Sequence, residues 1–169
     1  MSEVIIRKAT VDDELASIEI RHKSWLSAYK NIFSEEEINK HFEAKYNDAS
    51  YRERNRKRIE KTEHFYIAEQ NGKPVAILIV EPNNRFGDAE IECLYCLPEV
   101  QRQGIGGMLL DVAKRIFRES FKEKFILFAL KENEVGCAFY RNHDGVVVDE
   151  YADELCGKIV QKQKYEFDL

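Results

Sequence analysis

Residues 89–107 read AEIECLYCLPEVQRQGIGG, and this stretch decides how the rest of the chain is interpreted. Residues 89–97 have the composition of a β-strand, which Pro98 ends because proline cannot donate to a ladder. Gly104-Ile105-Gly106-Gly107 then opens a helix, where the glycines let the backbone approach an anion. The free N–H groups and dipole of a helix start favour negative charge, and Arg102 adds a cation. A diphosphate would suit this turn; a glycine-rich turn without a ligand is the alternative.

The common nucleotide fingerprints do not describe this turn. A Walker A loop would end in Gly-Lys-Ser/Thr, but Met108 follows Gly107 here. A dinucleotide fold needs G-x-G-x-x-G and an acidic residue about 20 positions further on, after a parallel strand. The spacing here is Gln-x-x-Gly-x-Gly, so an ATP- or dinucleotide-binding protein is disfavoured.

The remaining segments alternate between helical and strand-like patterns. Asn71-Gly72 is a strong hairpin signal between two strands. The pattern predicts one domain over 1–169, of the mixed α+β or α/β class, with helices packed on a mixed sheet. Strands are expected at 4–7, 65–69, 75–80, 89–97, 125–130, 146–151 and 158–167, and helices after Thr10 and at 35–42, 49–61, 104–117 and 135–142.

Composition narrows the class of protein. The net charge of −5 argues against a nucleic-acid binder that works by phosphate neutralisation, and the basic run 52–58 is interpreted as a solvated helix face. No secretory signal and no apolar stretch of the roughly 18 residues that span a membrane is visible, so a cytoplasmic location is expected. The four cysteines are interpreted as free thiols, and the scattered histidines indicate no metal site.

Four motifs together resemble the GNAT superfamily of acetyl-CoA-dependent N-acetyltransferases over nearly the whole chain. Gln101, Gly104 and Gly106 match its Gln/Arg-x-x-Gly-x-Gly/Ala motif. Residues 89–98 resemble its central strand, Glu-x-x-x-Leu-Tyr-Val-x-Pro, with Cys96 in place of valine. The segments 133–140 and 25–29 resemble its Asn-x-x-Ala/Gly-x-x-Phe-Tyr and Trp-x-x-Ala-Tyr motifs. The resemblance implies a mostly antiparallel central sheet with a splayed central strand, flanked by helices.

The resemblance also implies how acetyl-CoA would be bound. In the family, free backbone groups of the central strand pair with the pantetheine arm. By position, the Leu94 N–H would point at the thioester carbonyl and Cys96 would bind a pantetheine amide. Asn133 would cap the helix that follows it and bond the cofactor arm, although capping alone would explain it equally well. The full set of implied cofactor contacts is Leu94, Tyr95, Cys96, Gln101, Arg102, Gln103, Gly104, Ile105, Gly106, Gly107, Asn133 and Tyr140.

Two carboxylates are candidates for the general base that deprotonates an amine. Glu90 and Glu92 are two residues apart on one strand, so both are expected on the face that carries Leu94 and Cys96. Glu90 matches the position of the family's commonest base, and Glu92 would lie nearer the thioester. Either could act through a water, and both could contact the acceptor. The alternative is a polar sheet face near solvent.

Three aromatic residues are candidates for the acid and the acceptor site. Tyr140 would donate its hydroxyl proton to the departing CoA sulfur, or would be a core aromatic beside Phe139. Trp25 and Tyr29 are four residues apart on a helix, which is typical of core packing. The family places this helix over the acceptor, so they are also candidates for lining its site.

The expected function is direct acetyl transfer from acetyl-CoA to a primary amine of a small molecule or peptide, in a ternary complex. The alternative is a CoA-binding regulatory or sensing domain without turnover. Two site carboxylates would favour a cationic acceptor such as a polyamine or a lysine side chain. Protein N-termini, aminoglycosides and small amino compounds stay open, and a homodimer through the terminal strands is plausible.

Overall fold

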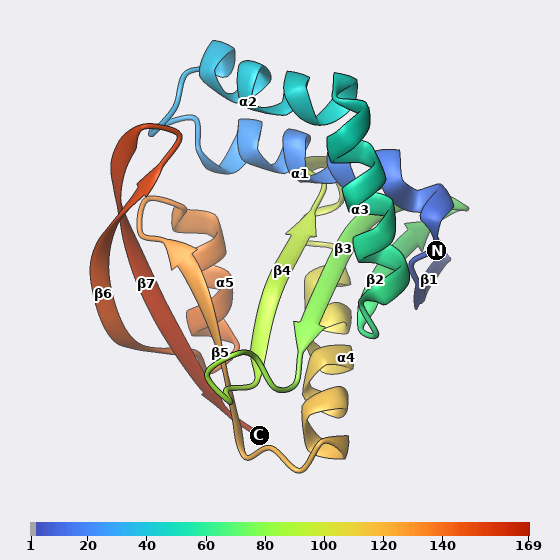
Figure 1. Cartoon of the computed structure of the whole chain (residues 1–169). Coiled ribbons are helices and arrows are strands. Elements are labelled where there is room, and N and C mark those ends of the chain that lie inside the picture. The colour runs from blue at the N-terminus through green and yellow to red at the C-terminus, as the bar shows by residue number, and fades with distance from the viewer. Residues whose placement is uncertain (1–2) are drawn as a thin grey trace.

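Seven strands form one sheet in the order β1-β2-β3-β4-β5-β7-β6 in the computed structural model, which describes residues 3–169 (Figure 1). All neighbouring strands are antiparallel except β4 and β5. Helices lie on both faces. The strands are β1 (Val4–Lys8), β2 (Phe65–Gln70), β3 (Lys73–Glu81), β4 (Glu90–Cys96), β5 (Lys124–Leu130), β6 (Val146–Leu155) and β7 (Lys158–Asp168), and the helices are α1 (Glu14–Ala28), α2 (Glu35–Asn47), α3 (Ala49–Lys61), α4 (Ile105–Glu119) and α5 (Glu134–Asn142).

The predicted helices and strands all form, and the differences lie at their ends. The capping box at Thr10 is present, but it starts a short 3-10 turn, Val11–Asp13, from which α1 continues. Helix α2 runs to Asn47 instead of ending at 42: the Ser34–Glu37 capping box holds its start, and at its end the Asp48 N–H still donates to the Ala44 carbonyl. The mixed, mostly antiparallel sheet flanked by helices confirms the predicted fold class.

Strands β4 and β5 part soon after they meet. They are paired only where Glu90 lies opposite Ile126, and from there toward the end of β4 they diverge (Figure 1). On its other side β4 is paired with β3 along its length. The end of β4 that leads into the glycine loop therefore has one free backbone edge.

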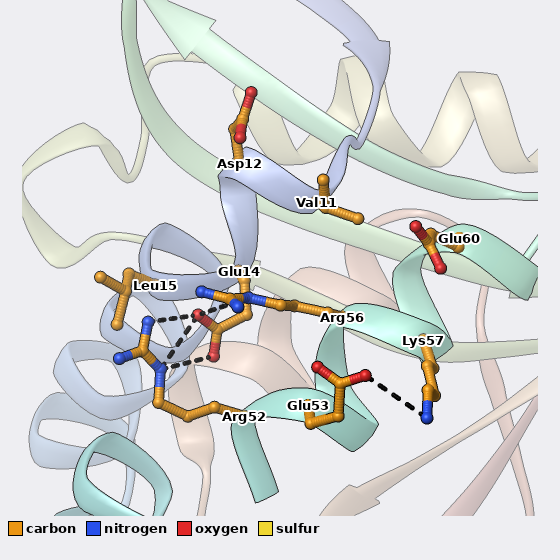
Figure 2. Close-up of a pocket in the computed structure, with 9 residues that line it drawn as sticks. All are labelled: Val11, Asp12, Glu14, Leu15, Arg52, Glu53, Arg56, Lys57 and Glu60. Carbon is orange, nitrogen blue, oxygen red and sulfur yellow. Dashed lines mark hydrogen bonds and ion pairs between the residues drawn. The ribbon is translucent and has the colours of Figure 1, made fainter. Parts of the chain in front are cut away.

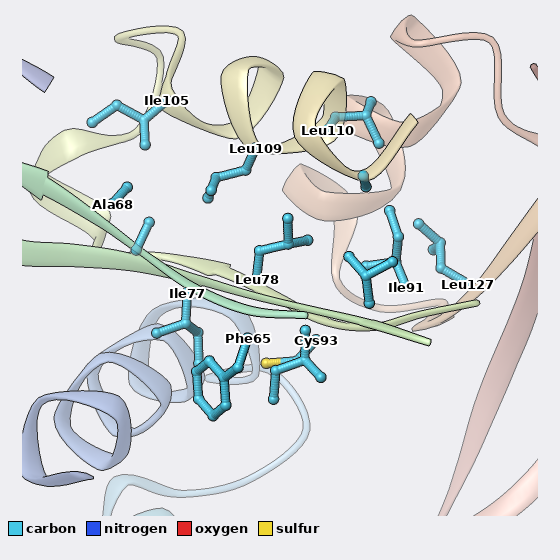
Figure 3. Packing of buried hydrophobic residues seen from close by; sticks show 14 of the residues in the cluster. Phe65, Ala68, Ile77, Leu78, Ile91, Cys93, Ile105, Leu109, Leu110 and Leu127 are labelled. Carbon is cyan, nitrogen blue, oxygen red and sulfur yellow. The ribbon is translucent and has the colours of Figure 1, made fainter. Parts of the chain in front are cut away.

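A β-bulge divides β4. Cys93 lies opposite Ile79, whereas Ile91 lies opposite the next residue, Val80, so Glu92 is an extra residue in the strand. The bulge changes which side chains face which layer of helices. Figure 3 shows Ile91 on the α4 face of the sheet and Cys93 on the opposite face, which α1 covers.

The core lies on both faces of this sheet. On one face Leu78 packs toward Leu109 and Leu110 of α4, and on the other Ile77 and Phe65 point toward α1 (Figure 3). A second cluster joins α1 and α2 to the end of the β6–β7 ribbon through side chains that include Tyr29, Phe33, Phe42 and Val160. Strand β4 is thus held between two helical layers.

Candidate active site

The glycine loop has the geometry of an anion site. Arg102 and Gly104 adopt the left-handed conformation, with φ of 62° and 85°, which turns the chain sharply into α4. The first backbone bond of this helix runs from the Met108 N–H to the Gly104 carbonyl, at 3.0 Å. The N–H groups of residues 105–107 precede the helical ladder and are available to an anion.

Gly106 is closely surrounded in this first turn. A Cβ atom there would lie 3.2 Å from the Phe139 ring and 3.9 Å from the Cys96 sulfur. A Cβ at Gly107 would be 3.6 Å from His143. The start of α4 therefore lies against both β4 and α5, and the lack of a side chain at 106 allows this close packing.

The free edge of β4 lies beside this turn. The Leu97 N–H donates to the Val75 carbonyl of β3 at 2.9 Å. Because backbone groups alternate sides along a strand, the N–H and carbonyl groups of Cys96 and Leu94 face away from β3, where β5 has diverged. The Cys96 carbonyl accepts from Ser24 Oγ at 3.2 Å and Gln101 Nε2 at 3.3 Å. The N–H groups of Leu94 and Cys96 on this edge fit the amide-bearing arm of a pantetheine.

The side chains of the loop are held near its surface. Gln103 Nε2 donates to the Glu99 carbonyl at 3.1 Å, and Gln103 Oε1 accepts from Gln70 at 2.9 Å. Gln101 and Arg102 are exposed. The structure therefore brings the predicted loop residues together around the start of α4.

Helix α5 places Tyr140 against β4. The Asn133 side chain caps the helix by accepting from the Gly136 N–H at 3.1 Å. Tyr140 packs against the main core, and its hydroxyl interacts electrostatically with Tyr95, Cys93 and Cys96 of β4. Burial raises the pKa of Tyr140 far above its usual value. Its hydroxyl stays protonated at working pH, as a proton donor requires.

The prediction that Glu90 and Glu92 share a face with Leu94 and Cys96 is wrong. Leu94 lies opposite Leu78 and so faces α4, whereas Glu92 accepts a hydrogen bond from Arg58 of α3. The bulge inserts one residue and so reverses the alternation. Glu90 precedes the α4-facing Ile91 and accepts from Asn84 Nδ2 at 2.7 Å. Both carboxylates lie on the face covered by α1 and α3.

Trp25 and Tyr29 lie at this same face, where Tyr95 joins them. The Trp25 indole N–H donates to the Tyr95 hydroxyl at 3.2 Å, and the Tyr29 hydroxyl interacts electrostatically with Tyr95. Trp25 also stacks on His41 of α2, with centroids 4.9 Å apart. Trp25 and Tyr29 are thus packed, as their helical spacing predicts, and both also contact β4 through Tyr95. The sequence motif had placed Tyr95 only among the cofactor contacts.

Two thiols of β4 lie at the site. Burial raises the pKa of Cys93 to about 11 and that of Cys96 to about 12. Neither is a thiolate near neutral pH, so neither is prepared to act as a nucleophile.

The interpretation of the basic run as a solvated face is partly wrong. Arg52 donates to the buried Glu14 at 2.8 Å, and Arg56 lies 3.9 Å from it (Figure 2). These ion pairs attach α3 to α1 around a surface pocket that includes no predicted site residue. Arg58 reaches β4 through Glu92.

Among residues 3–169, no group of three or more His, Cys, Asp or Glu side chains could hold a metal ion. In the same part of the chain, no helix is both long and apolar enough to cross a membrane.

Comparison with known proteins decides the family. The family model of the Acetyltransferase (GNAT) family matches residues 26–145. The chain belongs to the GNAT family. It is therefore an acetyltransferase that uses acetyl-CoA, and the resemblance found in its motifs is confirmed. The Trp-x-x-Ala-Tyr detail of the first helix stays a prediction.

Individual relatives agree with this assignment. The chain is 26% identical over 171 residues to a spermidine N(1)-acetyltransferase of Thermoplasma acidophilum, covering 95% of this chain and 97% of that protein. The crystal structure of PaiA N-acetyltransferase from T. acidophilum in complex with coenzyme A has a TM-score of 0.74 at 24% identity, over 96% and 99% of the two chains. A GCN5-related N-acetyltransferase from Rhodopseudomonas palustris has a TM-score of 0.79 at 17% identity, over 100% and 98%.

Proposed function

We propose that this enzyme transfers the acetyl group of acetyl-CoA directly to a primary amine of a small molecule or peptide, within a ternary complex. One observation carries the proposal. The free edge of β4 meets the open first turn of α4, and the hydroxyl of the partly buried Tyr140 lies beside the same strand. An anion site, an amide-binding edge and a proton donor thus converge.

Each group has a role in this reaction. The cofactor supplies the acetyl group as a thioester. The Leu94 N–H would bind the thioester carbonyl, and a donor aimed at developing negative charge is typically worth about 2.7–4 kcal/mol of barrier. Tyr140 would give its proton to the sulfur. Glu90 or Glu92 would take the amine proton through a water, from the face covered by α1.

The state of the thiols supports direct transfer over an acetyl-cysteine intermediate. Cys93 and Cys96 are protonated near neutral pH, since burial raises the pKa of both. An amine is the stronger nucleophile available there once it has lost its proton. The cytosol remains the expected compartment, and a dimer through the terminal strands remains a prediction that the exposed Val146 and Val148 of edge strand β6 support.

A binding and a turnover measurement test the proposal. Acetyl-CoA at 100 times its Kd should stabilise the protein by about 2.7 kcal/mol in thermal unfolding. Thiol release should then follow addition of an amine from a panel that includes spermidine, small amino compounds and peptides. Stabilisation without thiol release from any amine would favour the alternative, a CoA-binding domain without turnover. No stabilisation would refute the cofactor site.

Separate Glu90→Gln and Glu92→Gln variants identify the base. The variant that removes the base should lose about 10²–10⁴-fold in kcat, the usual contribution of general base catalysis, with KM for acetyl-CoA unchanged. Glu60→Gln, on the exposed surface of α3, is the matched control. Wild-type kcat in both site variants would show that neither carboxylate acts on the amine.

A further inference from the structure

Polar pairs connect α1 and α3 in register. Glu14 is paired with Arg52, and one turn further along both helices Ser17 Oγ accepts from Asn55 at 3.4 Å. The next positions at this spacing are Arg21 and Arg58. The first two positions pair an acceptor on α1 with a donor on α3. The third position instead places two cations between the helices, and both act electrostatically on Cys93 of β4.

Arg21 has an unsatisfied edge. Its Nε and Nη2 atoms are buried, and they have no hydrogen-bond partner among residues 3–169. These two N–H groups lie on one edge of the planar guanidinium, and together they form the fork that binds a carboxylate or phosphate through two oxygens. A buried donor left without a partner is costly, so this edge requires an acceptor.

Lys45 brings a further charge to the cluster. Its ammonium lies 5.1 Å from the centroid of Phe42 and 5.5 Å from that of Tyr51. Burial and the neighbouring Arg21 lower its pKa, and no carboxylate is among the groups that act on it. Glu92 does lie nearby, but it is already paired with Arg58. Within residues 3–169, neither Arg21 nor Lys45 forms an ion pair with a carboxylate, whereas Arg58 does.

The cluster borders the strand where transfer would occur. Arg21 acts electrostatically on Cys93, the residue before Leu94, and Cys93 interacts with the Tyr140 hydroxyl. Resting on the function proposed above, we infer that the acceptor is an amine that carries an anionic group, a carboxylate or phosphate, a few bonds from its nitrogen. Arg21 and Lys45 bind that group and leave the amine at the thioester. A polyamine has a cation in place of this anion.

Four amines of similar length test the inference: β-alanine, phosphoethanolamine, propylamine and 1,3-diaminopropane. The enzyme should prefer an anionic member by about 10- to 100-fold in kcat/KM, the range for one charge-assisted contact. Its choice between β-alanine and phosphoethanolamine distinguishes carboxylate from phosphate. Arg21→Met should raise KM for that amine and lower its kcat/KM to the level of propylamine, so that the preference is lost.

Controls separate a binding role from a folding role. Arg54→Met, an exposed position on α3, should keep the preference, and Arg21→Lys should keep part of it. Lys45→Met should reduce it even if the Arg21 variants fold poorly. A wild-type preference for 1,3-diaminopropane, or an unchanged ratio in both Met variants, would overturn the inference.

A second readout does not depend on turnover. N-acetyl-β-alanine and N-acetylphosphoethanolamine should stabilise the CoA-loaded wild-type protein in thermal unfolding, and Arg21→Met should abolish the effect. If no amine released thiol, the proposed function would fail while this measurement still decided the anion site. No stabilisation by either compound would refute the site itself.

Discussion

Tyr140→Phe should lower kcat by about 10²–10⁴-fold, because the departing sulfur loses its proton donor. Acetyl-CoA should bind with unchanged Kd, since the ring and its packing against Tyr165 remain. Burial raises the pKa of Tyr140. The wild-type rate should therefore show no loss from Tyr140 ionisation even near pH 10, the usual tyrosine pKa. Steady-state kinetics and a binding titration measure the two effects.

Tyr151→Phe is the matched control for this variant. Tyr151 lies on β6, partly exposed beside Phe128, and loses the same hydroxyl away from the site. It should keep the wild-type kcat. Equal activity of Tyr140→Phe and wild type would remove Tyr140 from the mechanism and leave it as a core aromatic.

The backbone conformation of the site could be predicted from the sequence, because each turn and cap there depends on residues that are close together in the chain. A glycine-rich turn after Pro98 and a capping Asn133 depend on residues close in the chain, and the structure has both. The free edge of β4 followed from the family motif, and its pairing only at Glu90 agrees with that expectation.

The faces of β4 could not be predicted in the same way. Strict alternation assigned Glu92 to the face of Leu94, but a bulge depends on how the strand pairs with Ile79 and Val80 of β3. Nothing in the strand's own residues specifies that register shift.

The ion pairs between residues far apart in the chain could not be predicted from the sequence either. The run 52–58 was interpreted as solvated, whereas Arg52 and Arg58 find Glu14 and Glu92 on other elements. The convergence of Arg21 and Lys45 likewise depends on the packing of α1, α2 and α3, which no local pattern reports.

Gly106→Val should weaken acetyl-CoA binding by about 100-fold or more, equivalent to two lost charge-assisted hydrogen bonds. A Cβ at this position would already lie 3.2 Å from the Phe139 ring, so a larger side chain must displace that ring or the first turn of α4, whose N–H groups would bind the diphosphate. Gly106→Ala should give a smaller loss, although alanine favours the helix by about 1 kcal/mol over glycine. Binding titrations together with thermal unfolding of the ligand-free variants separate affinity from stability.

The choice of acyl donor shows which part of the cofactor the glycine turn binds. Acetyl-pantetheine has the thioester arm but no diphosphate, so its kcat/KM should be nearly the same in Gly106→Ala and wild type. That result would mean that the N–H groups at the start of α4 bind only the diphosphate of acetyl-CoA. The free edge of β4 would bind the pantetheine arm, which both donors share. An equal loss with both donors would instead mean that the substitution displaces β4 through Phe139 and Cys96, and that residue 106 has no specific role toward the diphosphate.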